Sequence, residues 1–214
     1  DYLTIGNTEM NTPIEIKSVL DNIEKAKTDD RIKGIYLNVS AVNAGLSHVE
    51  EIRNKLLDFK SSGKFIISYA EYYSQKSYYL SSVADELYLH PEGIFELKGL
   101  SAQIMFYKGL LDKLNIEAQV IRHGKFKSAI EPYVLDKMSM ANREQISLLL
   151  TTISDNILDS IASQRGKTLA EIEELANKLE LNTAKKCLEN NFVDALVYQD
   201  GLEEKLKSKL GEVE

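Results

Sequence analysis

The sequence predicts an α/β fold in which a mostly parallel sheet is covered by helices, with a C-terminal helical extension. Three observations support this prediction. Over the first 123 residues, amphipathic helix patterns alternate with short continuous apolar runs, which are typical of strands buried on both faces of a parallel sheet. After Lys127 the pattern changes to helices. Finally, 3 Pro and 11 Gly among 214 residues are below the usual share of about 12%, which disfavours a disordered chain.

The first predicted helix begins at a capping box. Thr12 is the cap, Pro13 takes the first helical position, and Glu15 lies three residues after the cap. Apolar residues then recur at helical spacing as far as Ala26. Residues 32–39 (IKGIYLNV) are predicted to form the first buried strand, because the run is short and rich in β-branched and aromatic residues.

A second capping box, formed by Ser47 and Glu50, is predicted to begin the next helix, which ends at residues 61–63. The other elements of the predicted core are, in order, strand 65–69, helix 74–85, strands 87–89 and 94–97, helix 105–114 and strand 116–122. The turn sequence His-Pro-Glu-Gly at residues 90–93 separates the two short strands. Since parallel strands need crossovers, we expect right-handed connections through the helices.

The predicted extension begins with a helix that is capped by Ser139, runs to about Arg165 and ends at Gly166. About 25 residues correspond to about 37 Å, which is long for a helix of a compact domain. Its apolar stripe consists of Ile146, Leu149, Leu150, Ile153, Ile157 and Ile161. Thr168 and Glu171 form a third capping box, and the remaining predicted elements are helices 168–179, 183–190 and 201–210, with a returning strand over 193–198.

We therefore expect two parts in this chain. A core over residues 1–138 carries Lys127, and an extension over residues 139–214 packs on a neighbouring domain or subunit. The chain starts at Asp1 and not at Met, so the simplest interpretation is a processed protein or a piece of a longer one. An N-terminal membrane anchor of such a parent would not be visible in this sequence.

Composition excludes some function classes. The net charge is −7, with 26 basic against 33 acidic residues, so no basic footprint for nucleic acid stands out. No apolar run approaches the roughly 20 residues that cross a bilayer. Cys187 is the single cysteine and cannot form an internal disulfide.

Lys127 is the strongest candidate for chemistry in this chain. It lies in the segment HGKFKSAIEPY, residues 123–133, directly after a predicted strand. A lysine titrates near 10.4 in water, but desolvation lowers its pKa by disfavouring the charged form. A neutral lysine can then remove the proton of a serine hydroxyl. The competing interpretation is an ordinary surface lysine, since Lys125 lies two residues away.

No serine in the sequence is a convincing nucleophile. Ser61 and Lys64 match the Ser-x-x-Lys spacing of penicillin-recognising enzymes, but they end a helix and enter a strand, which is the wrong context. Ser74 and Ser77 begin a helix after a strand, where nucleophiles do occur, but helix capping already explains them. Ser128 adjoins Lys127, and neighbours along an extended chain point apart.

Other reactive residue types have simpler explanations. The three histidines show no metal-ligand spacing: His48, His90 and His123. Cys187 lies in an exposed helix pattern and is interpreted as a packing residue. An aromatic cluster is predicted to lie in the core or in an interface: Tyr72, Tyr73, Tyr78 and Tyr79. The segment around Gly45 has too few glycines to cradle a phosphate, so the sequence predicts no cofactor and no metal site.

The segment FKSAIEPY, residues 126–133, resembles the YKSAxEPF segment of the signal peptide peptidase A (protease IV) family, and in particular the N-terminal half of its long, two-domain form. Supporting stretches span nearly the whole chain, among them ADELYL at residues 84–89, DKMS at residues 136–139 and VDA at residues 193–195. The resemblance implies a crotonase-like and ClpP-like α/β fold. It also implies a serine protease with a Ser-Lys dyad that cleaves leftover signal peptides.

By this resemblance, Lys127 is the general base and the serine comes from the C-terminal half of the protein, which is absent here. The family's serine falls at about Gln75, which cannot attack a carbonyl. The double-glycine turn that supplies oxyanion-hole N–H groups is reduced to Gly45. The implied partners are the serine-bearing domain, further copies in a homo-oligomer, and signal peptides. The implied location is the bacterial cell membrane, with the catalytic domains on the periplasmic side.

Two alternatives remain open at this stage. The chain can be a non-catalytic duplicated domain that serves oligomer assembly, which the long helix and the tyrosine cluster favour. A crotonase-type enzyme acting on coenzyme A esters is suggested by fold analogy alone. For the first hypothesis, we expect the isolated chain to be inactive, because the nucleophile is missing.

Overall fold

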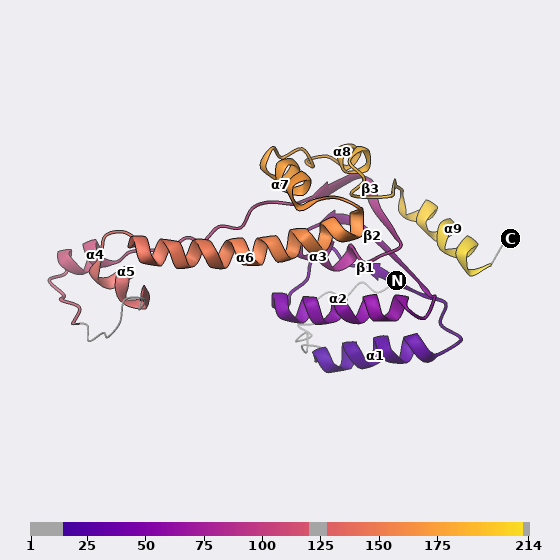
Figure 1. The fold of residues 1–214 in the computed structure, drawn as a ribbon, viewed down its shortest axis with the longest axis horizontal. Helices are drawn as coiled ribbons and strands as arrows, with labels where there is room; N and C mark the ends of the chain where they lie inside the picture. The colour runs from indigo at the N-terminus through magenta and orange to yellow at the C-terminus, as the bar shows by residue number, and fades with distance from the viewer. Residues whose placement is uncertain (1–14, 120–127, 212–214) are drawn as a thin grey trace, which may run out of the picture. The chain divides into compact units, whose positions relative to one another are not determined.

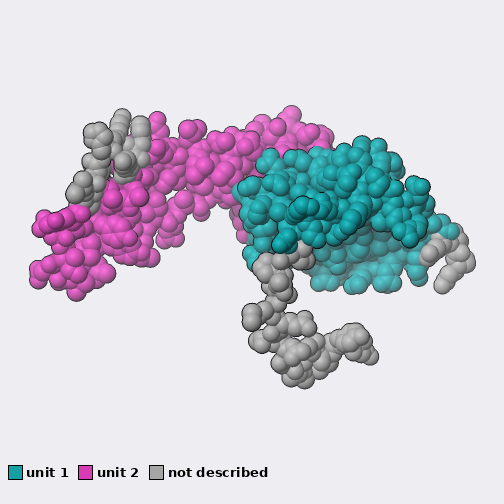
Figure 2. All heavy atoms as spheres, turned by 90° about the horizontal axis from the view of Figure 1, so that it is seen from below, with its two compact units in different colours: residues 1–96, 181–214 teal, residues 97–180 magenta. Residues whose placement is uncertain are grey.

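The computed structural model describes residues 15–119 and 128–211. Two compact units make up the chain: residues 1–96 together with 181–214, and residues 97–180 (Figure 2). The first unit contains the sheet, and the second contains the long helix. The boundaries between these units fall at residues 96/97 and 180/181 and not at residue 138. The division into a core over residues 1–138 and an extension over residues 139–214 stays a prediction.

A parallel sheet forms the centre of the first unit (Figure 1). In the described residues it has the order β1 (Gly34–Asn38), β2 (Phe65–Tyr73), β3 (Glu86–Phe95) and β4 (Ala195–Leu196). Each neighbouring pair is parallel. The predicted α/β class, with a mostly parallel sheet and covering helices, is confirmed.

Two aspartates hold the beginnings of neighbouring strands in register by the same arrangement. Asp85 lies just before β3, accepts the N–H of Ile66 at 2.7 Å and donates its own N–H to the Ile66 carbonyl at 2.8 Å. Asp194 lies just before β4, accepts the N–H of Leu87 at 2.7 Å and donates to the Leu87 carbonyl at 2.7 Å. Bonds to an ionised acceptor are stronger than neutral ones, so each pair secures the start of a strand.

The third strand differs from the prediction. Residues 90–93 were expected to form a turn between two short strands, but β3 passes through them as one element. The pairing with β2 shifts register between Ala70 and Tyr72, which accommodates the extra residues in an irregularity. Gly93 permits this close approach, since a Cβ there would lie 2.9 Å from the Glu71 carbonyl oxygen.

Two other predicted strands also differ. Residues 193–198 contribute only the two-residue β4. For the predicted strand 116–122, residues 116–119 are not in a strand, and the rest lies outside the described residues. β2, in contrast, extends four residues past the predicted end at Tyr69.

Both faces of the sheet are covered. Ile67 and Tyr69 of β2 and Tyr88 of β3 form a buried cluster with Leu202 of α9 (Gln199–Leu210), so α9 covers one face. Ile66, which alternates with these residues along β2, is also fully buried, so the opposite face is covered as well. Burial on both faces explains why the strands are continuous apolar runs in the sequence.

The helices of the first unit largely match their predicted positions. α1 (Ile16–Thr28) and α2 (Leu46–Lys60) pack on one another (Figure 1), followed by α3 (Gln75–Ser81) and, after the second unit, α8 (Ala184–Glu189). The expected cap of α1 at Thr12 lies outside the described residues, but Glu15, which was expected within the first turn, is instead the extended cap residue, so α1 begins later than predicted. The capping box predicted at Ser47 is wrong, because α2 begins at Leu46 with Gly45 as its cap residue.

An aromatic cluster connects the segment after residue 181 to the earlier part of the first unit. The ring of Tyr78 lies 4.6 Å from Phe95, 5.8 Å from Tyr73 and 5.9 Å from Phe192 between centroids. The Tyr78 hydroxyl also donates to the Phe192 carbonyl oxygen at 2.7 Å. Residues far apart in sequence therefore complete one core.

The second unit consists of helices and connections. Its helices are α4 (Lys108–Lys113), α5 (Glu131–Val134), α6 (Met140–Arg165) and α7 (Leu169–Asn177). The predicted start and end of α6 are confirmed: Ser139 accepts the Asn142 N–H, and Gly166 adopts the left-handed conformation with φ 62°. The capping box of α7 at Thr168 is also confirmed.

The apolar stripe predicted along α6 is buried only in part. Ile157 and Ile161 in the C-terminal half are buried, whereas Leu149 in the N-terminal half is 59% exposed. The predicted ends of the helix are therefore correct, while Ile146, Leu150 and Ile153 of the stripe are only partly buried.

Candidate functional site

Lys127, the predicted general base, lies outside the described residues, as does His123. The described chain resumes at Ser128, which begins a 3₁₀ turn, Ser128–Ile130, and α5 follows directly. The role of Lys127 stays a prediction. The structure does, however, describe the residues that immediately follow it.

Glu131 is the first residue of α5, and its carboxylate is almost fully buried, with 5% of the residue exposed. One carboxylate oxygen accepts the hydroxyl of Ser139 at 2.5 Å. The other accepts the backbone N–H of Ser139 at 3.1 Å and the side-chain amide of Asn142 at 2.9 Å. All three donors belong to the N-terminal end of α6. The sequence analysis did not select Glu131 as a functional residue, although it lies within the lysine-bearing motif.

A second contact holds α5 in place. The backbone N–H of Tyr107 donates to the Pro132 carbonyl oxygen at 2.6 Å. The rings of Tyr107 and Tyr133 are stacked with centroids 5.8 Å apart. The segment after Lys127 is thus attached to both α4 and α6 of the second unit.

By the resemblance, the family's serine is expected at about Gln75, and this residue lies just after the end of β2, where α3 begins. Carboxyl ends of parallel strands are common sites of ligands and catalytic groups. Gln75 is the first residue of α3 and is partly buried. The preceding Ser74 caps α3 by accepting the Ser77 N–H at 3.2 Å, and the Ser77 hydroxyl donates to the Ser74 carbonyl at 3.0 Å. The capping interpretation is confirmed for Ser74, whereas Ser77 lies in the first turn of α3.

Gly45 has a structural role at the beginning of α2. Its backbone is extended, with φ −64° and ψ 152°, and its carbonyl accepts the N–H of Val49 at 3.1 Å. A Cβ on Gly45 would meet no atom within 4 Å, so the fold does not require glycine here. Lys76 of α3 donates to the neighbouring Ala44 carbonyl at 2.7 Å, which ties this loop to the start of α3.

The Ser-x-x-Lys segment at residues 61–64 carries no nucleophile. The hydroxyls of Ser61 and Ser62 donate to the carbonyls of Asp58 and Phe59 at 2.6 and 2.7 Å. Lys64 donates to the Ala26 and Asp29 carbonyls, both at 2.7 Å, at the end of α1. These groups close two helix ends, as the sequence context indicated.

Among the described residues, His48, His90 and Cys187 lie in separate surroundings. His48 is exposed on α2, and His90 is partly buried, with its Nδ1 accepting the Glu92 N–H at 3.1 Å. Cys187 is fully buried, contrary to the exposed pattern inferred from sequence, while its interpretation as a packing residue is confirmed. Burial raises the pKa of the Cys187 thiol to about 12, which keeps it protonated and a poor nucleophile.

The tyrosine cluster lies in the core. Tyr73 and Tyr78 are fully buried, and burial raises the pKa of the Tyr73 hydroxyl above its ordinary value. The Tyr72 hydroxyl donates to Glu96 at 2.9 Å. Arg53 is buried, and its guanidinium lies 5.0 Å from the centroid of the Tyr79 ring. This cation–π contact helps to stabilise the buried positive charge.

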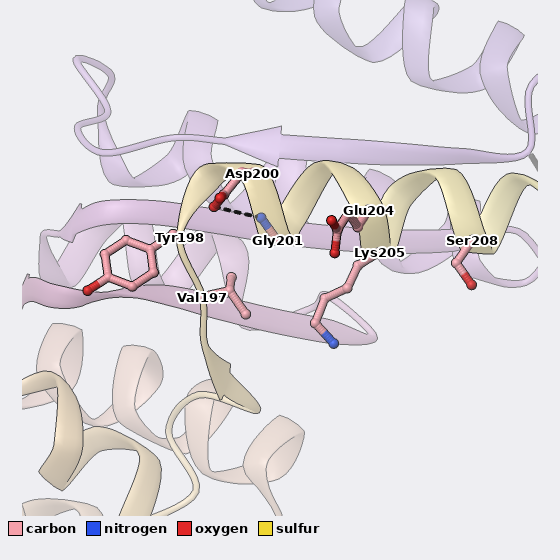
Figure 3. A pocket seen from close by; sticks show the side chains of 7 residues that line it. All are labelled: Val197, Tyr198, Asp200, Gly201, Glu204, Lys205 and Ser208. Atoms are coloured by element: carbon pink, nitrogen blue, oxygen red, sulfur yellow. Dashed lines mark hydrogen bonds between the residues drawn. The ribbon is translucent and has the colours of Figure 1, made fainter. Parts of the chain in front are cut away.

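A shallow open groove of about 490 Å³ lies along α9 (Figure 3). Its lining is Val197, Tyr198, Asp200, Gly201, Glu204, Lys205 and Ser208. The ammonium of Lys205 lies 5.2 Å from the Tyr88 ring centroid, and the Asp200 carboxylate accepts the Gly201 N–H at 2.9 Å. One helix and the residues just before it line the groove, and its lysine, Lys205, lies over an aromatic ring.

The described part of the chain contains neither a metal-binding cluster nor a membrane-spanning helix. Among residues 15–119 and 128–211, no cluster of three or more His, Cys, Asp or Glu side chains is placed to hold a metal ion. In the same ranges, no helix combines the length and the apolar character needed to cross a membrane.

Comparison with known proteins adds the family context. The sequence profile of peptidase family S49 matches residues 58–213. The chain is 35% identical over 204 residues to "Serine protease SPPA, chloroplastic" of Arabidopsis thaliana, covering 95% of this chain and 30% of that protein. It is 33% identical over 201 residues to "Protease 4" of Salmonella typhi, covering 90% of this chain and 32% of that protein.

A third similarity agrees with the first two. "Protease 4" of Haemophilus influenzae is 35% identical over 145 residues, covering 67% of this chain and 24% of that protein. The chain therefore spans at most about a third of the length of these curated relatives. The parallel sheet with its covering helices agrees with the crotonase-like and ClpP-like α/β fold expected from the resemblance.

Proposed function

This chain belongs to peptidase family S49, and we propose that it is the lysine-donating half of a membrane-associated serine protease. In this proposal Lys127 is the general base, and the serine nucleophile is supplied by a C-terminal half that this chain lacks. The substrates are cleaved signal peptides, and the catalytic domains lie on the periplasmic side of a bacterial membrane. Assembly into a homo-oligomer belongs to the same proposal.

The observation that carries the proposal is the pairing of a family lysine motif with a missing serine. By the resemblance, the serine's position falls at about Gln75, the first residue of α3, and an amide cannot act as the nucleophile. The neighbouring hydroxyls of Ser74 and Ser77 hydrogen-bond to one another at 2.9 Å, and Ser74 caps the helix. A nucleophile must then come from elsewhere in the full-length protein.

The chemistry requires a neutral lysine. Desolvation lowers the pKa of a lysine, so that its amine can take the serine proton as the serine oxygen attacks the peptide carbonyl. The lysine then returns this proton to the leaving amine. A general base of this kind contributes about 10²- to 10⁴-fold to the rate.

The test is Lys127→Ala in the full-length protein, with cleavage of a fluorogenic signal-peptide segment as the assay. We expect turnover to fall at least about 10²-fold, because no base takes the serine proton. Lys127→Arg should fall similarly, since a guanidinium stays protonated. Lys125→Ala is the matched control and should retain activity. A Lys127→Ala protein that keeps the unaltered rate would refute the proposal.

The second candidate function is a non-catalytic domain for assembly. The second unit exposes several large apolar side chains, which favours this alternative. They are Met105, Leu110, Leu114, Ile116, Tyr133, Met140, Leu148 and Leu149. A pure assembly domain would tolerate Lys127→Ala, so the same measurement distinguishes the two functions.

A further inference from the structure

We propose that Glu131 is a positioning residue, which holds the segment that directly follows Lys127 at the N-terminal end of α6. The inference rests on the proposed function, because it assigns Glu131 the task of orienting the base. Glu131 does not touch the reacting atoms in this proposal. It acts through the lysine.

The contacts of Glu131 are strong and directional. A buried carboxylate costs several kcal/mol unless hydrogen bonds and charge compensate for the lost water, by an order-of-magnitude estimate. Ser139 supplies two donors, at 2.5 and 3.1 Å, and Asn142 supplies a third at 2.9 Å. α6 has 26 residues, and the positive end of its dipole faces the carboxylate and stabilises the anion.

The chain connection transmits this anchoring to the lysine segment. Glu131 follows Lys127 by four residues, and the 3₁₀ turn Ser128–Ile130 fills the interval. Only these three residues separate the anchored Glu131 from the lysine, and they form a hydrogen-bonded turn. The Tyr107 N–H on the Pro132 carbonyl, at 2.6 Å, restrains the other side of Glu131.

Glu171 shows what a purely local carboxylate of the same type does. Its side chain accepts the N–H and the hydroxyl of Thr168, both at 2.7 Å, at the start of α7. That pair spans three residues and serves the helix end alone. Glu131 instead reaches eight and eleven residues along the chain, to Ser139 and Asn142, so it ties two separate elements together. Ser139 already caps α6 without Glu131, by accepting the Asn142 N–H at 3.1 Å.

The test uses Glu131→Gln in the full-length protein, with Asn142→Ala as a second, milder variant. Glutamine keeps the shape of the side chain but removes its charge, and its amide nitrogen replaces one of the two oxygens that accept hydrogen bonds from Ser139 and Asn142. The kcat and KM for a fluorogenic signal-peptide segment are measured per folded molecule, and circular dichroism gives the folded fraction. Glu171→Gln is the matched control, because it removes the same charge from another helix N-terminus.

For Glu131→Gln we expect kcat to fall about 10²-fold with KM unchanged, since displacement of a catalytic group by about 1 Å has this effect. Asn142→Ala should lower kcat by a smaller factor, and Glu171→Gln should leave it unchanged. An unaltered kcat per folded molecule in Glu131→Gln and Asn142→Ala would overturn the proposal, as would an equal fall in Glu171→Gln.

The remaining outcomes are also decisive. If Glu131→Gln does not fold, the kcat of Asn142→Ala decides the matter. If neither variant folds, Glu131 serves folding and the positioning role is refuted. A protein in which Lys127→Ala is fully active refutes the proposed function itself, whereas loss of activity in Lys127→Ala with normal kcat in Glu131→Gln refutes the positioning role alone.

Discussion

Replacing Phe192 by Ala tests whether the segment after residue 181 completes the core of the first unit. The Phe192 ring is 0% exposed. Its centroid lies 5.7 Å from that of Phe95 and 5.9 Å from that of Tyr78. The Phe192 carbonyl accepts the Tyr78 hydroxyl at 2.7 Å. The ring therefore contacts α3 and β3, and the backbone contacts α3.

The expected loss follows from these contacts. Truncation of a buried Phe to Ala lowers the free energy of unfolding by about 3–5 kcal/mol, because apolar contact is lost and a cavity remains. Aromatic pairs add about 0.5–1.5 kcal/mol each beyond the buried area. Two such pairs place the expected loss near the upper end, at about 4–5 kcal/mol. Since whole domains are stable by about 5–15 kcal/mol, the variant should be only marginally folded at 25 °C.

Urea unfolding, followed by far-ultraviolet circular dichroism and tyrosine fluorescence, measures this loss; the chain contains no Trp. Tyr198→Ala is the control, because Tyr198 is 58% exposed and its ring packs edge-on against His90, with the centroids 5.1 Å apart. Its expected loss is about 1 kcal/mol or less. A loss in Phe192→Ala no larger than in Tyr198→Ala would show that residues 181–198 do not complete this core.

Two further properties can be measured on the same protein. Gly93→Ala should lower the free energy of unfolding by about 1–3 kcal/mol, because a Cβ there would lie 2.6 Å from Leu89 Cδ1 and 2.9 Å from the Glu71 carbonyl oxygen. Gly201→Ala in α9, where a Cβ meets no atom within 4 Å, should instead stabilise by about 0.5–1 kcal/mol, and equal melting temperatures for the two variants would contradict this reasoning. The Cys187 thiol has its pKa raised from 9.0 to about 12, so its contribution to stability is complete below pH 9 and declines as the pH rises toward 12, where the unfolded thiol is ionised and the folded one is not. Native protein at pH 8 should therefore react with a disulfide reagent far more slowly than protein in urea, and equal rates would show that the thiol is accessible.

Local patterns predicted the helix ends well where the capping groups are neighbours in sequence. Thr168 and Glu171 form their reciprocal pair as expected, and Ser139 and Gly166 delimit α6. These features depend on hydrogen bonds within one turn of chain, which residue type and spacing determine. The spacing of Ser47 and Glu50 predicted a cap at Ser47. In the structure the cap residue is Gly45, two positions earlier, whose backbone is extended.

Features that depend on distant groups were not predictable from the sequence. Pro91 and Gly93 are turn residues by local preference, yet β3 continues through them because β2 accommodates the shift in register. Cys187 follows an exposed helix pattern, yet its thiol is buried and lies 3.6 Å from the Leu181 carbonyl oxygen. For the candidate site, Lys127 and Gln75 were singled out by motif, whereas the contacts of Glu131 with α6 appear only in three dimensions.

The sequence by itself determined the α/β class, the ends of the long helix and the motif that carries Lys127, because periodicity, capping and motif are all properties of neighbouring residues. Only the tertiary structure decided that residues 181–198 return to the first unit through Phe192 and Tyr78, and that the Glu131 carboxylate is buried at the start of α6. Both features depend on contacts between residues that are distant in sequence and on the burial of their polar groups. Such contacts stabilise the protein only in the folded chain, so local sequence patterns do not predict them.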